Sequence, residues 1–133
     1  MDSKPGTRQL LLDKVKSLTE HMVKNGMNIR PLPKVKFIED DVKNANDFFG
    51  KTAYYNPSQR VIALYTMNRH PKDIMRSFAH EMVHHEQNIN NRLDNITTQN
   101  TNEEGSLPEI EREAYEKGNM MFRNWTDKIT ENL

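Results

Sequence analysis

The chain has 133 residues, and its 19 lysine and arginine residues balance 19 aspartate and glutamate residues, so the formal net charge is zero. This length predicts one domain, residues 1–133, and a neutral composition argues against a DNA or RNA binder and against polybasic attachment to a membrane. The sequence has no apolar run of membrane-spanning length, no secretory signal and no cysteine. We therefore expect a cytoplasmic protein in which any metal site uses His, Asp or Glu.

The first predicted element is a helix at residues 7–25, because apolar residues repeat there at helical spacing and Gly26 follows as a C-terminal glycine. His21 lies in this helix and is interpreted as a packing or surface residue. A short strand is predicted at residues 34–38. The polar stretch at residues 39–47 does not indicate whether it holds a helical turn.

Two further strands are predicted at residues 51–55 and 60–66. The turn between them, Asn56-Pro57-Ser58-Gln59, has proline where its fixed φ is favourable, so the two strands should form a hairpin. With the strand at residues 34–38 they would make a small three-stranded sheet.

The next helix should begin at Pro71, which suits a first helical turn, and fade near Leu93. His70 directly before it is interpreted as a helix-start residue rather than a ligand. Residues 95–106 are rich in Asn, Thr, Gln and Glu and predict a loop, and a final helix is predicted at residues 107–130. The fold class predicted from this order of elements is α+β.

The most informative stretch is His80-Glu81-Met82-Val83-His84, which has the pattern H-E-x-x-H on the predicted helix. Residues four apart lie one turn apart, about 40° around the axis, so two imidazoles can reach the same ion. Apolar residues occupy the opposite side of this helix, which would pack by that side and present its ligands on a polar stripe. We predict His80 and His84 as zinc ligands and Glu81 as the general base that takes a proton from water.

A catalytic zinc usually has three protein ligands. No histidine follows His85, and Gln87 and Asn90 stand where the metzincin pattern H-E-x-x-H-x-x-G-x-x-H requires Gly and His. The third ligand should therefore be a carboxylate, most simply one from the final helix.

A helical wheel separates the glutamates of that helix. Glu111 falls within its apolar face, about 100° from Ile110, whereas Glu113 falls on the opposite side at about 300°. A carboxylate on a core-facing stripe needs a cation, because burying it alone is costly. We favour Glu111, with Glu113 as the next candidate, and an ion pair of Glu111 with Arg or Lys inside the fold is the alternative to a metal ligand.

H-E-x-x-H followed by a helix with Glu-x-x-Ala resembles the gluzincin branch of zinc metallopeptidases. In that family the third ligand is the glutamate three residues before the alanine, which is Glu111 in Glu111-Arg112-Glu113-Ala114. Many gluzincins have Asp after this alanine, where it supports a metal-bound histidine, but here the position is Tyr115. Residues 50–125 look like the short metallopeptidase domains of bacteria and phages. The resemblance implies a minimal zincin-like fold, a Zn2+ cofactor and a peptide or protein substrate.

The resemblance also implies that a strand upstream of the metal helix binds extended substrate by edge pairing, here residues 60–66 or their partner at 51–55. An oxyanion-stabilising donor is expected too. None is singled out, and a packing role is the simpler interpretation for each candidate: Tyr54, Tyr55, Tyr65, Tyr115 and His85. The small size of the chain predicts a shallow, open site.

The predicted function is thus a zinc-dependent metallopeptidase. The alternative is a zincin-fold zinc-binding module with weak or no catalysis that acts as a binding or regulatory protein. Nucleic-acid binding is not expected from the neutral composition, and the feature that would indicate it is a local basic patch such as Arg60, Arg69, Lys72 and Arg76. The sequence indicates neither the substrate nor the oligomeric state.

Overall fold

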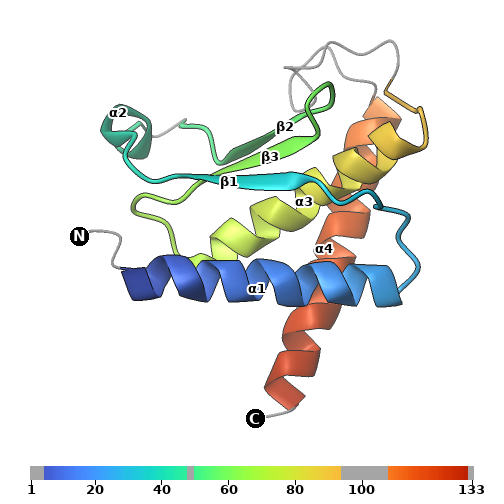
Figure 1. Ribbon diagram of the computed structural model, residues 1–133, viewed down its shortest axis with the longest axis horizontal. Helices are drawn as coiled ribbons and strands as arrows, with labels where there is room; N and C mark the ends of the chain where they lie inside the picture. Colours follow the sequence, from blue (N-terminus) through green and yellow to red (C-terminus); the bar gives the residue numbers. More distant parts are fainter. Residues whose placement is uncertain (1–4, 48–49, 94–107, 132–133) are drawn as a thin grey trace.

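The computed structural model describes residues 5–47, 50–93 and 108–131 (Figure 1). Within these residues the chain is α+β, with one long helix lying against a small sheet and the other two long helices packed on that helix (Figure 1). Its elements are α1 (Pro5–Lys24), β1 (Lys34–Ile38), α2 (Val42–Ala45), β2 (Ala53–Asn56), β3 (Val61–Tyr65), α3 (Pro71–Ile89) and α4 (Pro108–Glu131). None of the described helices carries an apolar stretch long enough to cross a membrane. The loop predicted at residues 95–106 lies outside the described residues.

The predicted ends of the elements are confirmed to within a few residues, and local chemistry explains several of them. After α1, Gly26 has a φ of 90°, and its N–H donates to the carbonyl of Val23 at 3.1 Å. Such a left-handed residue closes a helix, and glycine adopts it without the clash of a Cβ. In the turn after β2, the side-chain oxygen of Asn56 accepts from the N–H groups of Ser58 and Gln59, both at 3.1 Å. These bonds fix the hairpin.

The three strands are arranged in the order β1-β3-β2, so β3 is central. β1 runs parallel to β3, with Lys34 opposite Val61, and β2 runs antiparallel to it, with Ala53 opposite Leu64. The expectation that residues 60–66 could pair with an extended substrate is therefore wrong, because β3 is already hydrogen-bonded on both sides. Among the described residues, β2 is hydrogen-bonded to a neighbouring strand on one side only, so it is the edge strand of the hairpin.

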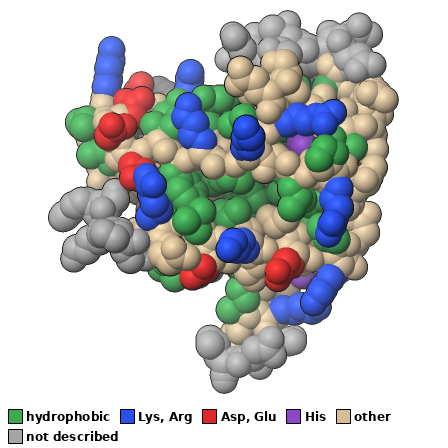
Figure 2. All heavy atoms as spheres, in the orientation of Figure 1, with side chains coloured by type: hydrophobic (Ala, Val, Ile, Leu, Met, Phe, Trp, Pro, Cys, Tyr) green, Lys and Arg blue, Asp and Glu red, His purple; other side chains and the backbone are tan. Residues whose placement is uncertain are grey.

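The hydrophobic core lies around α3, which contacts β2 and β3 on one side and α1 and α4 on others. The apolar face predicted for this helix is confirmed, since its central members are almost fully buried: Ile74, Met75, Phe78, Ala79, Met82 and Val83. From α1 the core receives Leu18 and Met22, which are also fully buried. Burying side chains of this size stabilises the fold by about 1.5–3 kcal/mol each. Figure 2 shows hydrophobic side chains around a hollow between α1 and β1, which Val15 and Leu32 line.

α4 packs unusually close to the backbone of α3 near His80. A Cβ added to Gly118 would lie 3.1 Å from the Cα of His80 and 3.3 Å from the carbonyl carbon of Ala79. Ala114, one turn before Gly118, is fully buried, as is Ala79. Small residues on both helices thus allow the two backbones to approach, and this approach sets the position of everything that α4 presents to α3.

We predict that Gly118→Ala destabilises the protein by about 1 kcal/mol in urea unfolding. Alanine normally stabilises a helix by about 1 kcal/mol relative to glycine, but overpacking costs about 1–3 kcal/mol and here the new methyl group meets rigid backbone. The exposed neighbour Asn119→Ala is the control, and it should be neutral or stabilising. A Gly118→Ala protein more stable than wild type would show that the helices are not in close contact.

Candidate metal centre

Three side chains from α3 and α4 converge on one point. Each of His80, His84 and Glu111 offers a ligand atom within 4.8 Å of the other two. The Nε2 of His80 lies 3.4 Å from Oε1 of Glu111, and the Nε2 of His84 lies 3.3 Å from Oε2. Ligand atoms bound tetrahedrally to zinc at about 2.0–2.2 Å are separated by about 3.4 Å. The donor set and its spacing are therefore compatible with a bound metal ion.

The helix geometry explains this convergence. The rings of His80 and His84, one turn apart on α3, have centroids 5.0 Å apart and an interplanar angle of 80°. Glu111 comes from the first turns of α4, which the contact at Gly118 holds against α3. The side chain of His84 is fully buried, whereas those of His80 and Glu111 remain 17% and 21% exposed. Solvent therefore reaches the group from the His80 and Glu111 side.

The polar side of α3 is open to solvent only in its first half, where Asp73 is exposed. In the second half of the helix, polar residues are buried as well as apolar ones: Glu81 is 2% exposed and Gln87 is 1% exposed. The physical reason is that α4 covers this part of the polar side, so α3 has the sheet on one side and another helix on the other. Sequence periodicity distinguishes apolar from polar faces, but it does not show whether a polar face is covered.

Electrostatic coupling within the group shifts the pKa values of its members. Burial alone would raise the pKa of Glu111, but its contacts with His80 and His84 lower that pKa to about 2. Burial likewise favours a lower pKa for His84, but the contact with Glu111 and the charge of Glu81 outweigh it and raise the pKa. These contacts thus favour a charged carboxylate at Glu111 and a protonated ring at His84.

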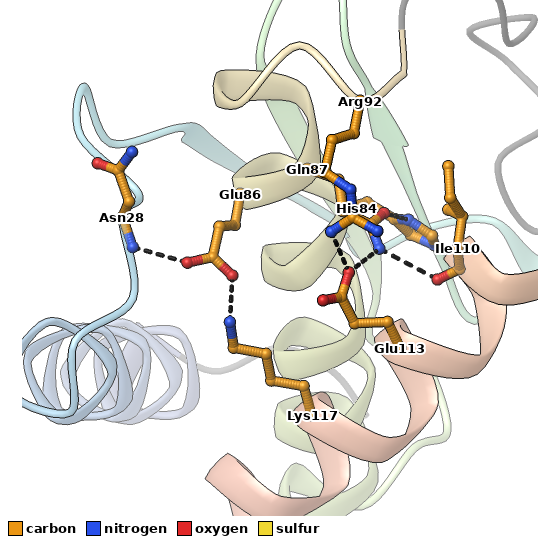
Figure 3. A network of polar contacts seen from close by, with 8 residues as sticks. All are labelled: Asn28, His84, Glu86, Gln87, Arg92, Ile110, Glu113 and Lys117. Atoms are coloured by element: carbon orange, nitrogen blue, oxygen red, sulfur yellow. Dashed lines mark hydrogen bonds and ion pairs between the residues drawn. The ribbon is translucent and has the colours of Figure 1, made fainter.

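Glu113, the other carboxylate considered as a ligand, is engaged elsewhere. It accepts from the Nε2 of Gln87 at 2.7 Å and from the Nη1 of Arg92 at 2.6 Å (Figure 3). The ion-pair partners of Glu111 are the two histidines, rather than the Arg or Lys of the alternative interpretation. The geometry therefore favours Glu111 over Glu113 as the third ligand.

Sequence reasoning missed the role of Gln87, which entered only as a mismatch to the metzincin pattern. Its Oε1 lies 2.8 Å from the Nδ1 of His84 (Figure 3). The signal that could have revealed it is the spacing, since a residue three after His84 lies on the same face of α3. Metal-binding histidines are commonly held by a hydrogen bond to their other ring nitrogen.

Two of the candidate oxyanion donors bond each other at a separate place in the core. The hydroxyl of Tyr55 lies 2.7 Å from the Nδ1 of His85 and accepts from the Nδ2 of Asn88. The Nε2 of His85 lies 2.8 Å from the carbonyl oxygen of Pro31. Burial lowers the pKa of His85 despite the opposing contacts with the carbonyls of Pro31 and Ile29, and this favours the neutral ring. Tyr55 and His85 are therefore structural.

Of the remaining candidates, Tyr115 is the one that contacts a predicted ligand. Its ring centroid lies 4.7 Å from that of His80, in an edge-on arrangement, and the side chain is largely exposed. Tyr54 and Tyr65 instead contact each other, with centroids 6.4 Å apart. Tyr115, at the position where many gluzincins have Asp, thus packs beside the metal centre at its open side.

The other two histidines have the structural roles expected for them. His70 begins α3, and its Nδ1 accepts from the N–H of Lys72 at 3.0 Å. His21 is buried in α1 near Asn25, and burial together with the charges of Lys128 and Lys24 lowers its pKa.

Comparison of the chain with protein-family models, with curated proteins and with solved structures gives no match in any of the three. What the structure establishes is therefore coarser than the resemblance to gluzincins. It is an α+β arrangement in which two histidines and a glutamate lie within metal-binding distance.

We predict a bell-shaped pH dependence for the stability that Glu111 contributes to the metal-free protein. The lowered pKa of Glu111 means that its contribution is fully present above about pH 4.5 and is lost as the pH falls toward 2. The raised pKa of His84 means that its contribution is present below about pH 6.5 and is lost as the pH rises through the raised value. The difference in the free energy of unfolding between wild type and Glu111→Gln should therefore be largest between these two pH values.

The measurement is urea unfolding of both proteins with a chelator present, over a series of pH values. Glu109→Gln, an exposed change on the same helix, is the control. If the difference between wild type and Glu111→Gln does not vary with pH, then the carboxylate and the imidazole are not paired.

Proposed function

We propose that this protein is a zinc-dependent metallopeptidase, with His80, His84 and Glu111 as zinc ligands and Glu81 as general base. The observation that carries the proposal is the convergence of Glu111 from α4 on the two histidines of α3. Two histidines and a glutamate from two helices, with ligand atoms within 4.8 Å of one another, are the number and kind of ligands that a catalytic zinc takes. The sequence pattern H-E-x-x-H supplies the second support.

A zinc ion in this centre would supply Lewis-acid chemistry, lowering the pKa of water toward about 7 and polarising the scissile carbonyl. Glu81 follows His80 directly on α3, and its charge acts on His84, so it lies close to the centre. In the proposed reaction it accepts the proton of the attacking water and passes it to the leaving amine. The substrate would enter from the side where His80 and Glu111 are exposed, next to Tyr115.

The burial of Glu81 favours a second candidate, a zinc-binding module of the same fold that acts as a binding or regulatory protein. With 2% of its surface exposed, this carboxylate has little access to a substrate in the structure as it stands. Under this alternative, the zinc ion would join α3 to α4 and Glu81 would serve the site's electrostatics. Metal binding is common to both candidates, and hydrolysis separates them.

Metal analysis tests the centre itself. Purified wild type should contain one zinc ion per chain, and His80→Ala and Glu111→Ala should each lose it, because two remaining ligands do not hold zinc tightly. His70→Ala removes a histidine from the start of the same helix and is the control that should retain zinc. Zinc retained in Glu111→Ala would remove this carboxylate from the ligand set and with it the observation on which the proposal rests.

Glu81→Gln distinguishes the two candidate functions. For a peptidase, this variant should keep its zinc and lose at least about 100-fold in the rate of peptide cleavage, since general acid–base catalysis contributes about 10²–10⁴-fold. The assay is mass-spectrometric detection of products from a mixed-sequence peptide library. A zinc-loaded wild type that leaves every peptide intact, or a Glu81→Gln protein as active as wild type, would contradict the peptidase mechanism.

A further inference from the structure

The side-chain amide of Gln87 is oriented by two groups that can only accept hydrogen bonds. Its Nε2 donates to the carbonyl oxygen of Ile110 at 3.1 Å and to Oε1 of Glu113 at 2.7 Å (Figure 3). A backbone carbonyl and a carboxylate offer no proton, so the atom facing them must be the NH₂ group. The opposite end of the amide, Oε1, therefore faces His84.

This orientation determines which nitrogen of His84 carries the proton. Because Oε1 of Gln87 is an acceptor, the Nδ1 of His84, at 2.8 Å, must donate to it. In the neutral ring the lone pair then lies on Nε2, which is the atom that faces Glu111 at 3.3 Å. Both His84 and Gln87 are fully or almost fully buried, so water cannot easily replace this bond.

The neighbouring histidine, His85, shows that such contacts determine which ring nitrogen carries the proton. His85 is equally buried, but its Nε2 lies near two carbonyl oxygens, those of Ile29 at 3.1 Å and Pro31 at 2.8 Å. Its proton must therefore lie on Nε2, and its Nδ1 accepts from the hydroxyl of Tyr55. Two adjacent histidines on α3 thus have opposite tautomers, and the one that suits a zinc ligand through Nε2 is His84.

We infer that Gln87 is a positioning residue of the proposed zinc centre: its amide, fixed by Ile110 and Glu113, holds His84 with Nδ1 protonated and Nε2 directed at the metal. The inference rests on the proposed zinc site. Glu113 is in turn held by Arg92 at 2.6 Å, so the chain of contacts runs from the metal ligand to the end of α3. The carboxylate that the helical wheel offered as a second ligand is, in this view, part of the support for His84.

Glu86 provides a matched control, because it is the residue directly before Gln87 and is also buried. Its carboxylate accepts from the backbone N–H of Asn28 at 2.7 Å and from the ammonium of Lys117 on α4. Figure 3 shows that it points toward Asn28 and Lys117, whereas Gln87 points toward His84. Removing either polar group breaks a contact between α3 and α4, but only Gln87 contacts a proposed ligand.

The experiment compares zinc affinity in wild type, Gln87→Met and Glu86→Met. Methionine keeps the length of both side chains and removes their hydrogen bonds. Gln87→Met should bind zinc about 10–100-fold more weakly, the usual effect of losing a residue that supports a metal ligand. Glu86→Met should lose stability in the metal-free form but bind zinc as wild type does. Equal affinity losses in both variants, in proportion to lost stability, would reduce Gln87 to a structural residue and overturn the inference.

A second measurement needs no variant to fold. Long-range ¹H–¹⁵N correlation spectra of the histidine rings in zinc-loaded wild type should show His84 protonated at Nδ1 and His85 protonated at Nε2. A His84 ring protonated at Nε2 would overturn the inference while leaving the zinc centre in place. Wild type that binds no zinc would instead overturn the proposed function and the inference with it.

Discussion

The candidate metal centre depends on how closely α4 approaches α3. Gly118 faces the backbone of His80 with no room for a side chain, and the buried Ala114 extends the close contact by one turn. One further turn toward the N-terminus of α4 lies Glu111, within 3.4 Å of His80 and 3.3 Å of His84. A larger residue at position 118 would move the helix axes apart by a distance comparable to the tolerance of a metal bond. Small residues in the helix interface therefore set the position of α4 on α3, and this position brings Glu111 to the two histidines.

The interface that results is polar where most helix interfaces are apolar. Among the polar residues that α3 buries are Glu81, His84, Glu86 and Gln87. Burying such groups is costly unless each is hydrogen-bonded or paired, and a partly satisfied group of this kind is less stable than an apolar one. Here α4 supplies many of the partners, with Lys117 for Glu86 and the carbonyl of Ile110 for Gln87. This cost is a reason to assign the interface a function rather than a purely structural role.

The sequence was sufficient to predict the elements and the three converging residues. The spacing of apolar residues, together with Gly26 after one helix and Pro71 at the start of another, predicts the helices. Because residues four apart lie one turn apart, the sequence also predicts that His80 lies beside His84. For Glu111, the wheel and the Glu-x-x-Ala spacing agreed, and the structure brings it to the histidines. The helix limits and the His80–His84 pair depend on local geometry, which a single chain segment determines, whereas the choice of Glu111 also used the resemblance to a known family.

What the sequence could not provide are relations between segments. The central place of β3 depends on β1 joining it in parallel, and no local pattern in residues 34–38 specifies this partner. The helical wheel places the histidines on a polar stripe of α3, but a wheel does not show what covers a face, and α4 covers part of this one.

The roles of Gln87 and Glu113 follow the same logic, since each depends on an atom of the other helix. The second contact of the Gln87 amide, to the carbonyl of Ile110, involves a backbone atom that no residue type encodes. A helix can therefore carry its metal ligands in a recognisable motif, while the groups that orient those ligands are specified only by the packing of the whole chain. In this protein both sets meet at one helix pair, so the same contact that brings Glu111 to the histidines also brings Ile110 and Glu113 to Gln87. Assembly of the ligands and orientation of His84 are thus a single consequence of α4 docking on α3.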